Sequence, residues 1–276
     1  MSTVVTMEDV RQAVRRLGLP DRPLEVHASL RSFGWVGGGA RSVVDAFLAE
    51  GCTVLVPTFS DAFFVALPPD QRPERNAIDY DRPLEPWQGA AAERVFTRQS
   101  NEYDRGPMGA LPGVVLDMPG RVRGDHPVMS FTAVGPLACD LADSQAPMDV
   151  YGPLRRLAEL DGAVVLIGVE LTRMTFLHYA EVLAGRRPFI RWANGPDGHP
   201  MEVQYGGCSK GFENLAPSLA HLERVVTVGV SHWRVYSARE TLAAAAEAIR
   251  QEPEVTFCVK RCGRCADAIA DGPLVE

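Results

Sequence analysis

Residues 163–189, AVVLIGVELTRMTFLHYAEVLAGRRPF, join a buried strand to a helix, and this unit decides the fold. The apolar run at 163–169 comes directly after an Asp-Gly pair, which is typical of a buried strand. The helical pattern that follows has Thr172 as a candidate N-cap and Gly185 as a candidate stop. A strand that leads into a helix in this way predicts an α/β protein.

Three side chains that could carry chemistry share one face of this helix. Thr175, His178 and Glu181 are spaced at i, i+3 and i+6. An imidazole one turn from a carboxylate, just past a strand end, is where an α/β enzyme places a general base. The alternative is a half-exposed His that forms an ordinary helix pair with a surface Glu. The Thr175 hydroxyl could donate to an oxyanion or bond to its own helix backbone.

Length and composition narrow the class of protein. The chain has 276 residues, of which 46% are hydrophobic and 23% charged, as in ordinary soluble proteins. No apolar run approaches the length of a membrane span, and the start, MSTVVTMEDVRQ, has no basic segment leading into an apolar one. We therefore expect a cytoplasmic protein without a membrane partner. The net charge of −7 argues against nucleic acid and favours cationic small substrates.

Helical and strand patterns alternate on both sides of the central unit. Before it, the patterns predict helices at 6–19, 40–50, 108–116 and 149–160, and strands at 24–29, 52–59 and within 123–136. After it, they predict a hairpin at 191–204, helices at 212–222 and 238–251, and strands at 224–236 and 255–259. Residues 61–107 have little periodicity and predict a long loop region.

A cluster of glycines lies between the first predicted strand and the next helix. It is RSFGWVGGGARS, with glycines at positions 34, 37, 38 and 39. Glycines let a backbone approach a ligand closely, and the N-terminus of the following helix attracts anions. The spacing matches neither a dinucleotide fingerprint nor a P-loop, and a flexible turn is the alternative.

The cysteine pattern near the C-terminus suggests a metal site. Cys258, Cys262 and Cys265 lie close together in CVKRCGRC, and Cys208 lies in a GGCS loop. Four thiolates in a reducing compartment match a closed, structural Zn²⁺ site, which leaves no open position for catalysis. A redox-active cluster or a chance grouping are the alternatives.

The other single candidates are less distinctive. Cys52 and Cys139 lie in apolar surroundings and are expected to be inert core residues. His126 precedes a proline, which favours an extended backbone. It is either a site residue or simply a loop packing residue.

Six separated stretches together resemble the aminoglycoside 3-N-acetyltransferase family. They are HASL (27–30), GWVGGG (34–39), VLVPTF (54–59), PMG (107–109), DHPVMSF (125–131) and GVELTRMTFLHYAE (168–181). The resemblance covers roughly residues 5–250. It implies an α/β fold with a central mixed sheet flanked by helices, as one domain over 1–276. If zinc is bound, the cysteine-rich segment, at about 254–276, is a small extension packed on the 206–212 loop.

The resemblance also implies a reaction and a set of site residues. The family uses acetyl-coenzyme A as donor and an amine of an antibiotic-like molecule as acceptor, and its catalytic His lies in a T-x-x-H-x-x-E motif, here Thr175, His178 and Glu181. The matching donor-binding positions are Ser29, Trp35, Val36, Gly37, Gly38, Thr58, Met108 and Gly109. Ser130 in DHPVMSF is included in this set. Arg31, Arg41 and Arg123 are candidates for the donor's phosphates, with simple surface charge as the alternative.

One departure concerns the acceptor. Many members of the family carry His-Asp-Ser-Asn before the motif Thr, whereas residues 171–174 here are Leu-Thr-Arg-Met. The missing acidic residue would normally lie near a polycationic aminoglycoside, so a different amine is an open alternative. Ala28 also replaces the first Ser of the usual HSSL.

We therefore predict an acetyl-coenzyme A-dependent N-acetyltransferase with His178 as general base. One alternative is a non-catalytic coenzyme A-binding or zinc-stabilised interaction protein of the same fold. A metal-dependent hydrolase is disfavoured because no H-E-x-x-H or comparable ligand set is present. Monomer and homodimer are both compatible with the sequence.

Overall fold

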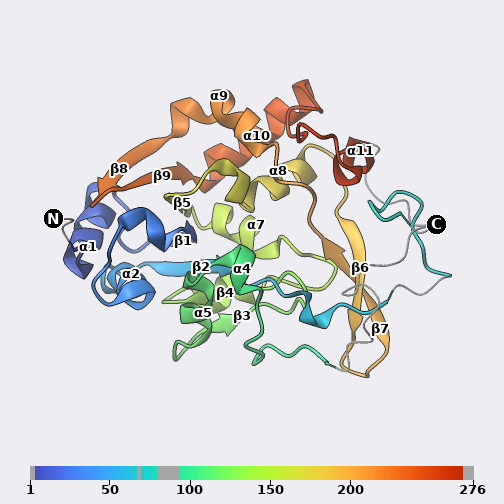
Figure 1. The fold of residues 1–276 in the computed structure, drawn as a ribbon, viewed down its shortest axis with the longest axis horizontal. Coiled ribbons are helices and arrows are strands. Elements are labelled where there is room, and N and C mark those ends of the chain that lie inside the picture. The colour runs from blue at the N-terminus through green and yellow to red at the C-terminus, as the bar shows by residue number, and fades with distance from the viewer. Residues whose placement is uncertain (1–3, 67–69, 80–93, 270–276) are drawn as a thin grey trace.

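The apolar run at 163–169 forms β5 (Ala163–Ile167), which is buried throughout and lies inside a seven-stranded mixed sheet. The computed structural model describes residues 4–66, 70–79 and 94–269. Strand order in the sheet is β3-β4-β2-β1-β5-β9-β8 (Figure 1). The other strands are β1 (Pro23–Ala28), β2 (Thr53–Pro57), β3 (Val122–Arg123), β4 (Phe131–Val134), β8 (Arg224–Val228) and β9 (Ser231–Ser237). Among the strand pairs of this sheet in the described residues, only β1–β2 and β1–β5 are parallel, which confirms the predicted mixed α/β architecture.

Helices cover both faces of this sheet, because alternate residues of the central strands point to opposite cores. Val165 and Ile167 pack in one core with α1 (Met7–Arg16), α2 (Gly39–Ala49) and α5 (Leu111–Leu116). Val164 and Leu166 pack in the other core. The helices on that side are α6 (Ala138–Ala142), α7 (Gly152–Glu159), α8 (Phe176–Leu183), α9 (Ala216–Leu219) and α10 (Ala238–Gln251).

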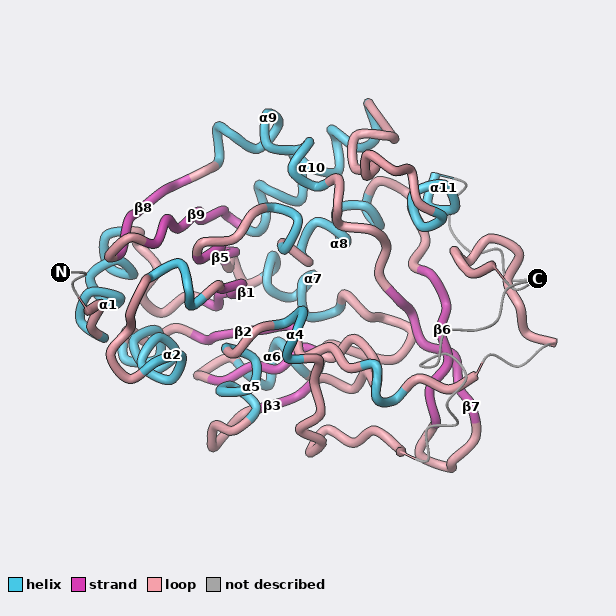
Figure 2. Tube along the Cα trace, in the orientation of Figure 1, coloured by secondary structure: helices cyan, strands magenta, loops and turns pink. Residues whose placement is uncertain are grey.

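A two-stranded hairpin lies outside the central sheet, and Figure 2 shows it to one side. It consists of β6 (Phe189–Asn194) and β7 (Pro200–Tyr205), which confirms the hairpin predicted at 191–204. At the other end of the molecule, α1 begins with a capping box between Thr6 and Asp9. Among the described residues, no helix is both long and apolar enough to cross a membrane.

Several local predictions are wrong. Thr172 is not an N-cap, because residues 171–173 form a separate 3₁₀ turn and α8 begins only after Thr175. The predicted helix at 108–116 is divided at Gly109, whose φ of 80° breaks α4 (Arg105–Met108) from α5. Cys139 is exposed on α6, whereas Cys52 is buried as predicted.

The C-terminal segment also differs from its prediction. Residues 255–259 form turns instead of a strand, because their backbone amides bond locally, as Val255 N does to Glu252 O. A helix that the cysteine spacing did not predict, α11 (Gly263–Ile269), then follows. Figure 1 shows α11 near the start of β6, away from the central sheet.

Candidate active site

The candidate site residues gather where the three parallel strands end. Ser29 follows β1, Thr58 follows β2 and Gly168 follows β5. In α/β sheets, ligands bind beyond the carboxyl ends of such strands. The Ser29 amide donates to Ile167 O at 2.9 Å, which joins two of these strand ends directly.

His178 and Glu181 form a buried pair on α8. Nδ1 of His178 lies 2.7 Å from Oε2 of Glu181, and each residue is only 7% exposed. The alternative of a half-exposed surface pair is therefore wrong. Because a carboxylate only accepts, Nδ1 carries the proton in this contact, and Nε2 is the ring nitrogen left to exchange a proton with a ligand. Within the described residues, Nε2 has no hydrogen-bond partner.

The end of α8 brings a cation to the same carboxylate. Arg186 N donates to Glu181 O and Gly185 N to Val182 O, which is the Schellman arrangement that ends many helices at a glycine. Because the chain changes direction here, the Arg186 guanidinium lies next to Glu181 and donates to its Oε1. Thr256 Oγ1 donates to the same oxygen at 3.0 Å. Both carboxylate oxygens are thus bound, so Glu181 is fixed in one orientation.

Apolar and aromatic groups enclose the imidazole. The Tyr151 ring stacks on His178 with an interplanar angle of 16°, and the Phe212 ring lies edge-on at 4.7 Å between centroids. Burial, together with the nearby Glu181 charge, raises the pKa of Tyr151 well above its usual value. Gly207 passes beside the pair, and a Cβ there would lie 3.6 Å from Oε2 of Glu181. These neighbours limit the water around the ring.

Thr175 lies at the N-cap of α8, one turn before His178. Its side chain makes no capping hydrogen bond within the described residues, and the residue is half-buried. Among the described residues, the hydroxyl therefore makes no capping bond to the helix backbone.

The glycine loop and the Met108–Gly109 turn flank the end of β1. Val5 pins the loop, because its amide donates to Trp35 O and its carbonyl accepts from Gly37 N. The Trp35 side chain is 67% exposed and free to contact a ligand. Gly109 packs opposite the carbonyl of Ala28, the residue before Ser29. The first turn of α2 begins at the end of this loop, with Gly38 as N-cap.

Three of the predicted donor-binding residues lie behind this surface in a buried network. Thr58 Oγ1 bonds to Ser130 at 3.1 Å and to Thr132 at 2.9 Å. Arg123 is 1% exposed and donates to Ser130 Oγ and to three backbone carbonyls. Burial lowers the pKa of Arg123 to about 10. These contacts occupy its guanidinium, so this arginine supports the strand ends from inside.

The other two candidate arginines lie at the surface. Arg41 pairs with Asp45 one turn along α2, at 2.9 Å. Arg31 is exposed in the 3₁₀ turn Leu30–Phe33, directly after Ser29. Arg31 is therefore the better placed of the two to meet a ligand at the end of β1.

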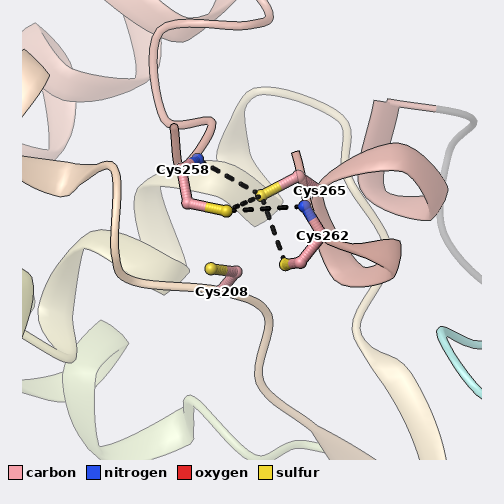
Figure 3. Close-up of side chains that lie close together, drawn as sticks. All are labelled: Cys208, Cys258, Cys262 and Cys265. Carbon is pink, nitrogen blue, oxygen red and sulfur yellow. Dashed lines mark hydrogen bonds between the residues drawn. The ribbon is translucent and has the colours of Figure 1, made fainter. Parts of the chain in front are cut away.

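The four predicted metal-ligating cysteines lie together although Cys208 is 50 residues before the others begin. Their Sγ atoms all lie within 4.8 Å of one another, and Figure 3 shows the four side chains gathered around one space. Cys265 Sγ is 3.6 Å from Cys258 Sγ and 3.7 Å from Cys262 Sγ, without a disulfide. A tetrahedral zinc site with bonds of about 2.3 Å separates its sulfurs by about 3.8 Å, so the cluster fits the ion.

Local hydrogen bonds prepare one of these thiols to lose its proton. The Cys262 amide donates to Cys258 Sγ, and this bond, with the neighbouring thiols, lowers the pKa of Cys258 to about 6. Burial raises the pKa values of Cys208 and Cys265. A bound cation would favour the thiolate form of all four.

Sequence reasoning missed the groups that hold the pair in place, namely Tyr151, Arg186, Gly207, Phe212 and Thr256. Only Arg186 had a local signal, since it follows the predicted helix stop at Gly185. His126 has an internal role: its Nδ1 accepts from Val128 N and Met129 N, and its Nε2 bonds to Gln204 O at 2.9 Å. It is therefore a loop packing residue, which joins its own loop to β7.

The fold and the site define a class of protein, an α/β protein with a buried His–Glu pair beyond the ends of parallel strands. The chain belongs to the aminoglycoside 3-N-acetyltransferase family, whose sequence model matches residues 26–250. Aminoglycoside N(3)-acetyltransferase IX of Micromonospora chalcea is 33% identical over 195 residues, a match that spans 66% of this chain and 64% of the relative. The match thus spans less than two thirds of that relative's length.

Solved structures share the fold. The crystal structure of the aminoglycoside acetyltransferase AAC(3)-Xa matches with a TM-score of 0.71 and 28% identity, over 90% of this chain and 93% of that chain. The structure of AAC-IIIb in a binary complex with CoASH matches with a TM-score of 0.73 and 20% identity, over 90% of this chain and 97% of that chain.

Proposed function

We propose that this chain transfers an acetyl group from acetyl-coenzyme A to an amine of an aminoglycoside or a similar antibiotic-like small molecule. The observation that carries the proposal is the buried His178–Glu181 pair, which leaves Nε2 of His178 as an unoccupied proton acceptor. Family membership supports the reaction class, and the names of the relatives supply the acceptor class.

In the proposed reaction, the amine nitrogen attacks the thioester carbonyl carbon while Nε2 of His178 takes the amine proton. Glu181 holds Nδ1–H and stabilises the imidazolium that forms. The C–S bond then breaks, and the imidazolium returns its proton to the departing coenzyme A thiolate. The Thr175 hydroxyl, which lies one turn before His178, is the proposed donor to the oxyanion of the tetrahedral intermediate.

The proposed donor site lies at the end of β1. Ser29, Arg31, the loop Trp35–Gly38 and the Met108–Gly109 turn line it, and the N-terminus of α2 offers backbone amides to a phosphate. The CoASH complex of AAC-IIIb, which shares the fold, supports this donor. Thr58, Ser130 and Arg123 support this region through their buried network.

A second acceptor class has its own supporting observation. Arg173 is part of the stretch that replaces the family's acidic residue, and its guanidinium lies 3.4 Å from Pro107 O, next to the proposed donor turn. A cation at this point repels a polycationic aminoglycoside. A less charged amine is therefore the alternative acceptor.

We also propose that Cys208, Cys258, Cys262 and Cys265 hold one structural Zn²⁺. The short distances between their sulfurs and the N–H···S bonds around Cys258 support this proposal. When bound, the ion would supply a crosslink between the GGCS loop and the C-terminal segment. With four thiolate ligands it has no open coordination position, so it takes no part in acetyl transfer.

The experiment that tests the function measures thiol release from acetyl-coenzyme A against a panel of amines. The panel contains aminoglycosides and singly charged amines at matched concentrations. Release that depends on an aminoglycoside supports the leading acceptor, and release only with the weakly charged amines supports the alternative. No release with any amine, together with normal coenzyme A binding, would favour the non-catalytic alternative.

A further inference from the structure

A threonine from the C-terminal segment completes the environment of the catalytic pair. Thr256 is 2% exposed, and its hydroxyl donates to Oε1 of Glu181 at 3.0 Å across 75 residues of sequence. Arg186 Nη1 donates to the Thr256 oxygen at 2.6 Å, so the hydroxyl links the guanidinium to the carboxylate. A charge-assisted hydrogen bond of this kind fixes the direction in which the carboxylate points.

The segment that carries Thr256 has little secondary structure of its own and is held by the 206–215 region. Asn214 Nδ2 donates to Val255 O at 2.9 Å. A Cβ at Gly211 would lie 2.3 Å from the carbonyl oxygens of Thr256 and Phe257, so only glycine permits this close approach. The two segments are therefore in backbone contact beside the catalytic helix.

Both segments reach the cysteine centre within two residues of their contact with the pair. Gly207 lies beside His178, where a Cβ would be 3.8 Å from Nδ1, and Cys208 is the next residue. Thr256 contacts Glu181, and Cys258 follows two residues later. The cluster of four sulfurs thus brings together the two segments that contact the imidazole and its carboxylate.

We infer that Thr256 is a positioning residue for the His178–Glu181 pair, and that the four-cysteine centre keeps Thr256 and Gly207 in contact with that pair. This inference rests on the proposed function, because it assigns His178 the role of base. The state of the cysteine centre then sets the rate of proton transfer while leaving the donor site at the end of β1 unchanged.

The first test separates the hydroxyl from the bulk of Thr256. Thr256→Val keeps the shape and removes the donor, whereas Thr256→Ser keeps the donor. We expect Thr256→Val to lower kcat about tenfold, since misorientation of a catalytic group costs up to about a hundredfold per ångström. The KM for acetyl-coenzyme A should stay within about twofold, and Thr256→Ser should retain most of kcat. The matched control is Thr241→Val, which removes a fully buried hydroxyl on α10 that has no hydrogen-bond partner among the described residues.

The second test addresses the cysteine centre. Cys262→Ser changes a cysteine that is several residues away in sequence from Gly207 and Thr256, whereas Cys208 and Cys258 lie within two residues of them. The control is Cys139→Ser, at an exposed cysteine. In the full chain, we expect Cys262→Ser to lower kcat and to increase amide exchange in residues 206–212 and 253–258. Calorimetric binding of coenzyme A should not change, because its proposed site at the end of β1 is built from other segments, the glycine loop and the Met108–Gly109 turn.

A spectroscopic readout keeps this inference separate from the proposed reaction. The His178 Nδ1 proton signal, followed by ¹H–¹⁵N NMR, should shift in Thr256→Val and Cys262→Ser and stay in place in Thr241→Val. An unshifted signal with wild-type kcat in both variants overturns the inference, as does equal loss of kcat in Thr256→Ser and Thr256→Val. Full turnover in His178→Ala would overturn the proposed function instead, whatever the signal shows.

Discussion

Oε2 of Glu181 lies 2.7 Å from Nδ1 of His178, one helical turn earlier on α8, and both side chains are buried. The other oxygen of the carboxylate is bound by Arg186 and Thr256. The carboxylate is therefore held in an orientation that keeps Oε2 directed toward the imidazole. This arrangement fixes the tautomer of His178 and makes Nε2 the atom on which the proposed chemistry depends.

His178→Ala should abolish acetyl transfer and leave the fold and coenzyme A binding intact. A general base contributes roughly 100- to 10,000-fold to the rate, so kcat should fall by about that factor. Steady-state thiol release with purified protein measures the loss, and His221→Ala, at an exposed position, is the control. If the variant keeps more than about a tenth of wild-type kcat, His178 is not the base.

Glu181→Gln should be nearly as damaging as His178→Ala. Sequence alone suggests a smaller loss, since glutamine keeps the shape of glutamate. In the structure, Arg186 and Thr256 require an acceptor, so the amide oxygen would face them and the NH₂ group would face Nδ1. That contact forces the proton onto Nε2, and the wrong tautomer costs on the order of 10,000-fold in a serine protease triad.

The measurement for Glu181→Gln is kcat together with ¹⁵N NMR of the imidazole. Glu247→Gln, at an exposed position on α10, is the matched control. A variant that retains Nδ1–H and loses less than about tenfold in kcat would contradict the proposed role of the carboxylate.

How far the sequence predicted the site depended on how local each contact was. β5, His178 and Glu181 lie within one short stretch of sequence. An apolar run and a helical period were therefore sufficient to predict the strand and to place the two side chains on one helix face. Thr256 reaches Glu181 through tertiary contact alone, and no period or motif marks it. The apolar residues around it suggested a strand, but the segment makes turns and packs on Gly211.

Gly38→Val should weaken coenzyme A binding and also lower stability. Gly38 has φ of 77°, and a Cβ would lie 2.3 Å from Ser42 Oγ, so valine distorts the first turn of α2. Calorimetry with coenzyme A measures the affinity, and thermal unfolding measures the loss of stability. Gly18→Val is the control, because Gly18 has φ of 63° and lies before β1, at the opposite end of the strand from the proposed donor site. Equal affinity in both variants would place the donor elsewhere.

Stability should fall as the pH falls from about 6.5 to about 4. Burial lowers the pKa of His126 to about 4, so its ring is neutral in the folded protein across this range and protonated in the unfolded chain. The unfolded state then binds more protons than the folded state. The contribution of His126 to the free energy of unfolding is therefore complete above about pH 6.5 and decreases by about 3 kcal/mol toward pH 4. Urea unfolding at several pH values measures it.

The control for this pH effect is His126→Gln, which cannot titrate. It should be less stable than the wild type at pH 8 and should show a weaker dependence of unfolding free energy on pH below 6.5. Identical slopes for the two proteins would show that His126 is not the group responsible.

Protein purified without added metal should contain about one zinc per chain, bound by Cys208, Cys258, Cys262 and Cys265. Since the ion binds only the folded state, its loss should lower the melting temperature. Elemental analysis should therefore show loss of zinc in Cys208→Ser and Cys262→Ser and retention in Cys139→Ser. Cys208→Ser is the sharper test, because the other three cysteines lie in one short segment and only this residue crosslinks it to the loop beside His178. If Cys208→Ser retains zinc and its melting temperature is unchanged, Cys208 is not a ligand. The metal would then bind the C-terminal segment alone and would not crosslink it to the loop.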